Sequence, residues 1–259
     1  MAQESTLGEV GYYALSAAQS QIANLLLGGL AVISLAFCVF TAIRERRAYP
    51  LYCFVGGSLA VYYELLTDIL GRCVWATKGE VVISSAFGRD LPLYANFVYM
   101  FYFPVAAVLI HQAIRKGVTT RQWFNWMLFG IPLAFVFELY PVSQRWWYYY
   151  GEGQPLSILG LPMWWSFAAT MAVTCSSALS LVVVDRFMQG RHSWSIMLVM
   201  PLSVVGLHMF VSFPVVTALS SSTSLLVTTP AALITMALSV AMLWAFGRVV
   251  CVDGGDHRS

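Results

Sequence analysis

The chain has 259 residues, of which 59% are hydrophobic and 10% are charged, with a formal net charge of +2. Soluble domains carry about 25% charged residues, so this composition excludes an ordinary soluble protein and predicts an all-α integral membrane protein. The small net charge and the lack of a basic groove-reading motif exclude nucleic acid as a partner.

Seven apolar stretches follow one another along the chain, each close to the ~20 residues that a helix needs to cross a bilayer. They cover residues 22–43, 50–71, 93–114, 123–142, 163–184, 194–215 and 226–248. We therefore expect a single seven-transmembrane-helix bundle over residues 22–248, an N-terminal segment over 1–21 and a tail over 249–259. No cleavable signal peptide is predicted, because residues 1–21 lack a basic start followed by an apolar run.

Lysine and arginine are distributed unequally between the two sides of this bundle. One side holds Arg44, Arg46, Arg47, Arg115, Lys116, Arg121, Arg186, Arg191, Arg248 and Arg258, and the other holds Arg72, Lys78, Arg89 and Arg145. The positive-inside rule then predicts a cytoplasmic C-terminus and an N-terminus outside or in a lumen.

Three carboxylates lie inside the apolar stretches. Glu64 and Asp68 share one face of the second span, four residues apart, and Glu138 lies in the fourth span. A carboxylate at bilayer depth costs about 2.5–3.5 kcal/mol, so three of them in the same outer half indicate a function. We predict Glu64 as a general acid, with Asp68 or Glu138 as a base or cation stabiliser.

The loops on the outer side bring polar and aromatic residues toward these acids. The predicted substrate-binding residues are Arg89, Asp90, Arg145, Trp146, Trp147, Tyr148, Trp165 and His208. An acid in apolar surroundings stays protonated near neutral pH, and aromatic faces stabilise a cation by about 0.5–2 kcal/mol each. This combination predicts a cyclase that acts on a lipophilic small molecule through a cationic intermediate, with neither a metal nor a cofactor.

The same residues could instead have purely structural roles. Aromatic runs such as 146–150 also form interfacial belts, and Asp68 could cap a helix end. Glu64 could pair with Arg89 or Arg145, Glu138 could be a buried hydrogen-bonded partner, and His208 could be an ordinary bundle histidine. Such a cavity would then serve a non-catalytic carrier or sensor of lipophiles.

Other membrane classes fit the residues less well. A retinal protein needs a lysine within a helix, whereas Lys78 and Lys116 lie in loops. The DxxxD or DDxxD pairs that hold magnesium in aspartate-rich prenyltransferases are missing, as are an internal transporter repeat and the DRY and NPxxY receptor motifs. None of the five cysteines forms a CxxC pair, so neither a disulfide framework nor a zinc site is predicted.

The segments YYELLTDILGR, GRDLPLY and FELYPVSQRWWYYYGEGQPLSILGLPMWW resemble the spirocyclase AveC-like family of small membrane enzymes, over approximately residues 60–166. The resemblance implies acid-catalysed closure of a dihydroxy-ketone polyketide to a spiroketal, sometimes with dehydration. It implies Glu64, Asp68 and Glu138 as candidate acids, with Arg89 and Asp90 in the first turn.

The chain is also similar to small seven-helix meroterpenoid cyclases, which carry an acid in the second span where Glu64 stands. These cyclases carry a second acid late in the chain, which has no counterpart here. After Asp185 the next acidic residue is Asp253, which lies in the tail. A membrane-bound terpene cyclase is therefore the second prediction. Membrane lipid is the expected surrounding partner, and the oligomeric state is left open.

Overall fold

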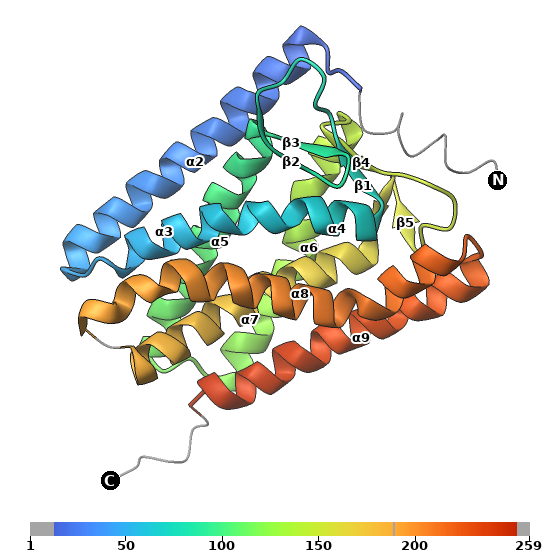
Figure 1. Ribbon diagram of the computed structural model, residues 1–259. Helices are drawn as coiled ribbons and strands as arrows, with labels where there is room; N and C mark the ends of the chain where they lie inside the picture. The colour runs from blue at the N-terminus through green and yellow to red at the C-terminus, as the bar shows by residue number, and fades with distance from the viewer. Residues whose placement is uncertain (1–12, 189, 253–259) are drawn as a thin grey trace.

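The computed structural model describes residues 13–188 and 190–252 (Figure 1). In this part of the chain, seven helical segments are long and apolar enough to cross a membrane. Each contains one of the seven predicted stretches, so the predicted helical architecture is confirmed. The expected terminal segments fall largely on residues 1–12 and 253–259, outside the described residues. The first helix of the described residues begins within the expected N-terminal segment, at Ala17.

The helical segments follow the chain from α2 to α9. They are α2 (Ala17–Glu45), α3 (Tyr49–Leu59) continued by the 3₁₀ turn η1 (Ala60–Tyr63) and α4 (Glu64–Gly71), α5 (Leu93–Arg115), α6 (Thr120–Ser143), α7 (Met163–Phe187), η2 (Gly190–Ser195), α8 (Ile196–Ser221) and α9 (Leu225–Val250). Ser16 and Thr119 begin α2 and α6 as capping boxes, each accepting a hydrogen bond from a backbone N–H three residues on. The second span is thus three pieces rather than the single helix that its sequence predicts.

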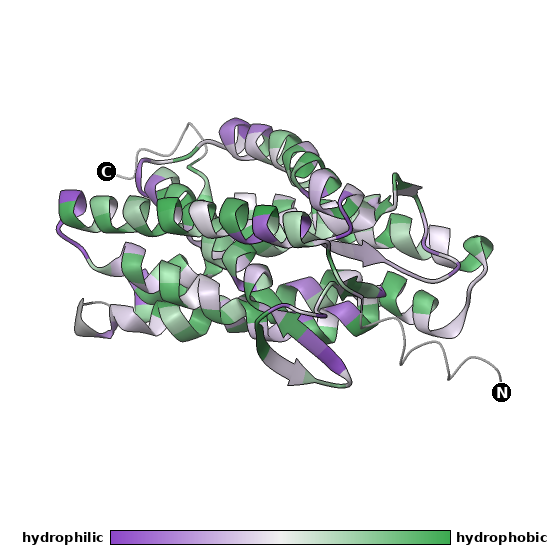
Figure 2. Ribbon diagram, turned by 90° about the horizontal axis from the view of Figure 1, so that it is seen from above, coloured by the Kyte–Doolittle hydropathy of each residue, from purple (hydrophilic) through white to green (hydrophobic). Residues whose placement is uncertain are grey.

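The helices form two layers. In Figure 1, α2, α3, α8 and α9 follow one another across the front, and each packs against the next. Behind them, α5 packs against α2, α3 and α7, whereas α6 rests mainly on α7 and α9. Large apolar side chains such as Leu25, Leu128 and Leu226 point outward with more than two thirds of their surface exposed. Hydrophobic residues dominate the helices (Figure 2), as a bilayer requires of an outer face.

A close contact between α3 and α5 depends on Gly57. A Cβ at this position would lie 2.8 Å from Cδ of Pro104 and 3.0 Å from Cβ of Phe103, and neither atom can move without its backbone. We expect Gly57→Leu to lower the free energy of unfolding by about 1–3 kcal/mol through overpacking. Denaturant unfolding in detergent measures this, and Gly29→Leu is the control because nothing lies within 4 Å of a Cβ there. Equal losses in both variants would contradict the packing argument.

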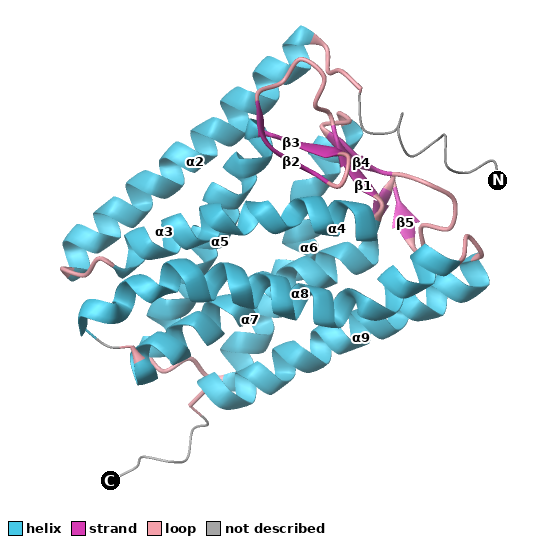
Figure 3. Cartoon of the chain, viewed as in Figure 1, coloured by secondary structure: helices cyan, strands magenta, loops and turns pink. Residues whose placement is uncertain are grey.

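Among the described residues, three short antiparallel strand pairs cover one end of the bundle, near the start of α2 (Figure 3). They are β1 (Cys73–Trp75) with β4 (Trp147–Tyr149), β2 (Val82–Ala86) with β3 (Arg89–Pro92), and β5 (Ser157–Ile158) with β6 (Leu161–Pro162). The sequence predicts only loops here. The β1–β4 pair matters most, because it joins the loop after the second span to the loop after the fourth.

Candidate functional site

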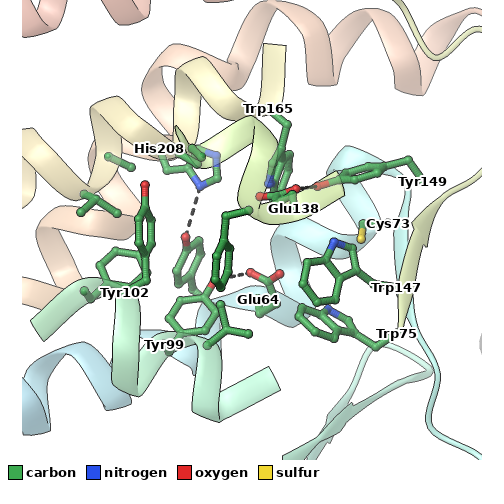
Figure 4. A pocket seen from close by; sticks show the side chains of 18 residues that line it. Glu64, Cys73, Trp75, Tyr99, Tyr102, Glu138, Trp147, Tyr149, Trp165 and His208 are labelled. Atoms are coloured by element: carbon green, nitrogen blue, oxygen red, sulfur yellow. Dashed lines mark hydrogen bonds between the residues drawn. The ribbon is translucent and has the colours of Figure 1, made fainter. Parts of the chain in front are cut away.

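A cavity of about 70 Å³ lies within the bundle, beneath the β1–β4 pair (Figure 4). Its walls come from the second span and from α5, α6, α7, α8, β1 and β4. The lining residues are Tyr63, Glu64, Cys73, Trp75, Val98, Tyr99, Tyr102, Phe103, Ala134, Phe137, Glu138, Trp147, Tyr149, Trp165, Ala169, Ala172, Val173 and His208. Two carboxylates and a histidine therefore share one largely aromatic space.

Glu64 is the first residue of α4, directly after the 3₁₀ turn, and its side chain is 5% exposed. Its Oε2 accepts a hydrogen bond from the hydroxyl of Tyr99 and a second one, of 3.1 Å, from Oγ1 of Thr67. Within residues 13–188 and 190–252, neither Arg89 nor Arg145 forms an ion pair with it. The structural pairing considered from the sequence is therefore not what the fold shows.

Glu138 reaches the same cavity from α6 and is only half-buried. The hydroxyl of Tyr149, in β4, donates a hydrogen bond of 3.0 Å to its Oε2. Burial raises the pKa of the Tyr149 phenol, so this group remains a donor. Figure 4 shows Glu138 between Tyr149 and Trp165, on the opposite side of the cavity from Tyr99. Each acid is thus oriented by one tyrosine.

His208 lines the cavity from α8 and is 2% exposed. Its Nδ1 shares a hydrogen bond of 3.2 Å with the hydroxyl of Tyr63, and its ring lies 5.1 Å from that of Trp165. Its other nitrogen, Nε2, has no hydrogen-bond partner among the described residues. A buried polar atom of this kind is available to a guest in the cavity.

The strand pair explains which aromatic residues reach the cavity. Side chains alternate between the two faces of a strand, and four from this pair face inward. They are Cys73, Trp75, Trp147 and Tyr149. Tyr148, between the two inward residues of β4, instead packs on Tyr13 with ring centroids 5.2 Å apart. Burial raises the pKa of the Cys73 thiol, which disfavours a thiolate nucleophile there.

Asp68 lies about 6 Å farther along α4 than Glu64 and is not among the residues that line the cavity. It is 2% exposed, and its Oδ1 accepts a hydrogen bond of 3.2 Å from the indole N–H of Trp75. Asp68 therefore holds a wall residue in place rather than facing the cavity.

The remaining predicted residues surround the site without lining the cavity. Nη2 of Arg89 donates to the hydroxyl of Tyr150 at 2.7 Å, and Asp90 accepts from Oγ of Ser85 at 2.5 Å. Arg145 adopts a left-handed backbone conformation (φ 56°), and its carbonyl accepts a hydrogen bond of 2.7 Å from Tyr13. Trp146 is buried, 5.5 Å from the ring of Tyr140. These contacts hold the loops over the cavity.

Several cavity residues escape prediction from the sequence. On α5, Tyr99, Tyr102 and Phe103 share a face at spacings of three and four residues, and this aromatic stripe is the signal that could have found them. Tyr63 precedes Glu64 directly. In the described part of the chain, no three His, Cys, Asp or Glu side chains gather as a metal site.

Comparison with known proteins adds no relative: the chain matches no protein-family model, no curated protein and no solved structure. The resemblance to the spirocyclase AveC-like family therefore depends on the three segments quoted above.

Proposed function

We propose that this chain is an integral membrane cyclase that closes a lipophilic polyketide to a spiroketal by acid catalysis. The observation that carries the proposal is the pair Glu64 and Glu138, which face one aromatic cavity from separate helices, each held by a tyrosine hydroxyl. The outward apolar faces of the helices support insertion in a bilayer. The distribution of arginines supports an N-terminus outside or in a lumen and a cytoplasmic C-terminus.

The two acids divide the proton transfers between them. Glu64 donates a proton to the hydroxyl of a hemiketal. The bond between the hemiketal carbon and this protonated hydroxyl then breaks, so that water departs and an oxocarbenium ion remains. The second hydroxyl of the substrate attacks that carbon and gives its proton to Glu138. The balance is one dihydroxy-ketone converted to one spiroketal and one water, with the first ring closure at the ketone preceding these steps. One proton has moved in effect from Glu64 to Glu138, and it returns to Glu64 before the next turnover.

The walls of the cavity suit such an intermediate. Faces of Tyr99, Trp147 and Trp165 offer cation–π stabilisation of about 0.5–2 kcal/mol each. Few water molecules fit in about 70 Å³, so the cation is protected from hydrolysis. An extended substrate needs more room than this, and we place its access between α5 and α6, where the rings of Phe101 and Phe137 meet at 6.0 Å.

Deletion of the gene in its host tests the proposal. We expect extracts of the deletion strain to lose a cyclic product and to accumulate a compound heavier by one water, as seen by mass spectrometry. Complementation with the intact gene should restore the product, and purified protein should convert the accumulated compound. Binding of that compound without conversion would indicate a carrier or sensor, and an unchanged metabolite profile would contradict the proposal.

A further inference from the structure

A chain of hydrogen-bonded side chains runs from Glu64 along one wall of the aromatic cavity to α8. The hydroxyl of Tyr99, in α5, donates to Oε2 of Glu64. The hydroxyl of Tyr63, in η1, is hydrogen-bonded to that of Tyr99, and the two rings meet edge-on with centroids 5.9 Å apart. The same hydroxyl of Tyr63 shares a hydrogen bond of 3.2 Å with Nδ1 of His208. We call Tyr99, Tyr63 and His208 the tyrosine–histidine chain.

The tyrosine–histidine chain is enclosed by other rings. Tyr99 is 6% exposed and stacks on Phe103 with centroids 5.0 Å apart, and His208 is 2% exposed against Trp165. A phenol can donate one hydrogen bond and accept others, and a neutral imidazole has one donor and one acceptor nitrogen. Each member can therefore receive a proton on one side and release another on the opposite side. Apolar surroundings strengthen such a chain, because its hydrogen bonds polarise one another.

The hydrogen bond to Glu64 sets the order of donors along the chain. When Glu64 is ionised, the hydroxyl proton of Tyr99 points toward it, so the oxygen of Tyr99 accepts from Tyr63. The oxygen of Tyr63 in turn accepts from the N–H at Nδ1 of His208. In that order Nε2 of His208 is left as an acceptor, and it has no hydrogen-bond partner among the described residues. The chain thus ends at the cavity in a free proton acceptor.

Glu138 and this free end lie beside the same side chain. The indole N–H of Trp165 donates to Glu138, and the ring of His208 lies 5.1 Å from that of Trp165. Figure 4 shows Glu138, Trp165 and His208 along one side of the cavity. One water molecule in the cavity could therefore connect Glu138 with Nε2, and the proposed ring closure releases one water there.

We propose that the tyrosine–histidine chain returns the proton from Glu138 to Glu64 between turnovers, which rests on the proposed cyclase function. Glu138 gives its proton to the water, and the water gives one of its own to Nε2 of His208. Nδ1 then gives its proton to Tyr63, Tyr63 gives its own to Tyr99, and Tyr99 gives its own to Glu64. One proton enters and one leaves each member, so none of them stays charged. Glu138 ends as a carboxylate and Glu64 as a carboxylic acid.

The cover over the cavity favours this internal route over exchange with bulk water. Trp75 and Trp147, from the β1–β4 pair, are each 4% exposed and lie 4.5 Å apart on the side of the strands. Few water molecules fit in about 70 Å³, so a path made only of water is short of members. Rotation of the two hydroxyls and exchange of the imidazole proton with water then restore the starting order.

Tyr63→Phe tests the chain, because it removes one hydroxyl and keeps the ring. The probe is the open-chain compound that accumulates in the deletion strain, mixed rapidly with the purified full-length protein in detergent. The first turnover uses the proton already on Glu64, whereas each later one waits for its return. We expect the ratio of the first-turnover rate to the steady rate to rise about tenfold or more, seen as a burst of product.

Two further variants show whether the chain acts as a unit. His208→Gln breaks it at the other end and should raise the same ratio, and the double variant with Tyr63→Phe should have a steady rate no lower than the slower single variant. Tyr102→Phe is the matched control, because it removes a hydroxyl that lines the same cavity from α5 outside the chain. An unchanged ratio in Tyr63→Phe, or an equal rise in Tyr102→Phe, would overturn the proposal.

Infrared difference spectroscopy examines the chain without turnover. The carboxyl band of Glu64, identified by its loss in Glu64→Gln, should shift in Tyr63→Phe and stay in place in Tyr102→Phe, because only Tyr63 bonds to the hydroxyl that contacts Glu64. An unshifted band in Tyr63→Phe would overturn the chain whether or not the protein is a cyclase. Loss of turnover in Glu64→Gln, combined with an intact ratio in Tyr63→Phe, would remove the relay and leave the cyclase proposal standing.

Discussion

Glu64→Gln is expected to reduce product formation by about 10²–10⁴-fold while the protein still binds its substrate, if Glu64 is the general acid. Glutamine keeps the size of the side chain, and its amide oxygen can still accept the hydrogen bond from Tyr99. What it loses is the proton that the leaving hydroxyl needs. The measurement is the initial rate with the compound that accumulates in the deletion strain, together with the affinity for that compound.

Asp68→Asn is the matched control for this substitution. The same change from carboxyl to amide is made one helical turn away, but Asp68 is not among the residues that line the cavity and contacts Trp75 instead. Its effect should therefore be a modest loss of stability, with turnover within a few fold of the intact protein. Full turnover in Glu64→Gln, or an equal collapse in both variants, would remove Glu64 from the acid role.

The seven helices could be predicted from the sequence because each depends on a long local run of apolar residues. The bounds agree closely, for example 93–114 predicted against Leu93–Arg115 observed. The interruption of the second span could not be predicted, since nothing in SLAVYYELL distinguishes a 3₁₀ turn from an α-helical one. That turn directly precedes Glu64, and a tight turn within a helix often marks a functional position.

The structure brings two of the three predicted acids to one cavity. Burial of a carboxylate in an apolar span is a local signal, and it drew attention to Glu64 and Glu138, which both line that cavity. Helical periodicity alone put Asp68 on the same face as Glu64 and could not show that the cavity ends between them. The neighbouring helices and strands determine how far a cavity extends along a helix. The spacing of two residues in the sequence carries no information about those neighbours.

The loop that contains residues 146–150 shows why the other cavity-lining residues could not be predicted from the sequence. Residues 146–150 are all aromatic, so hydropathy does not separate those that line the cavity from those that do not. Side chains alternate between the two faces of strand β4, and this alternation decides which of them face the cavity. Strand β4 in turn depends on its pairing with β1, where Trp75 lies opposite Trp147. Such a contact joins residues far apart in the sequence. Trp147 was therefore predicted together with Trp146 and Tyr148, although only Trp147 reaches the cavity.

Glu138→Gln is the second substitution with a large expected effect, about 10²-fold or more on turnover, because the attacking hydroxyl would lose its proton acceptor. Tyr149→Phe should cost less, about tenfold, since it removes only the hydrogen bond that orients Glu138.

The double variant Glu64→Gln with Glu138→Gln makes the stronger test of the pair. If both acids serve one proton cycle, removing the second adds little once the first is gone, so the double variant should be no slower than the slower single variant. Losses that multiply would mean that the two carboxylates act independently of each other and do not share one proton cycle. Unchanged turnover in Glu138→Gln alone would leave Glu64 without its partner, and water would then have to accept the second proton in a cavity that admits few water molecules.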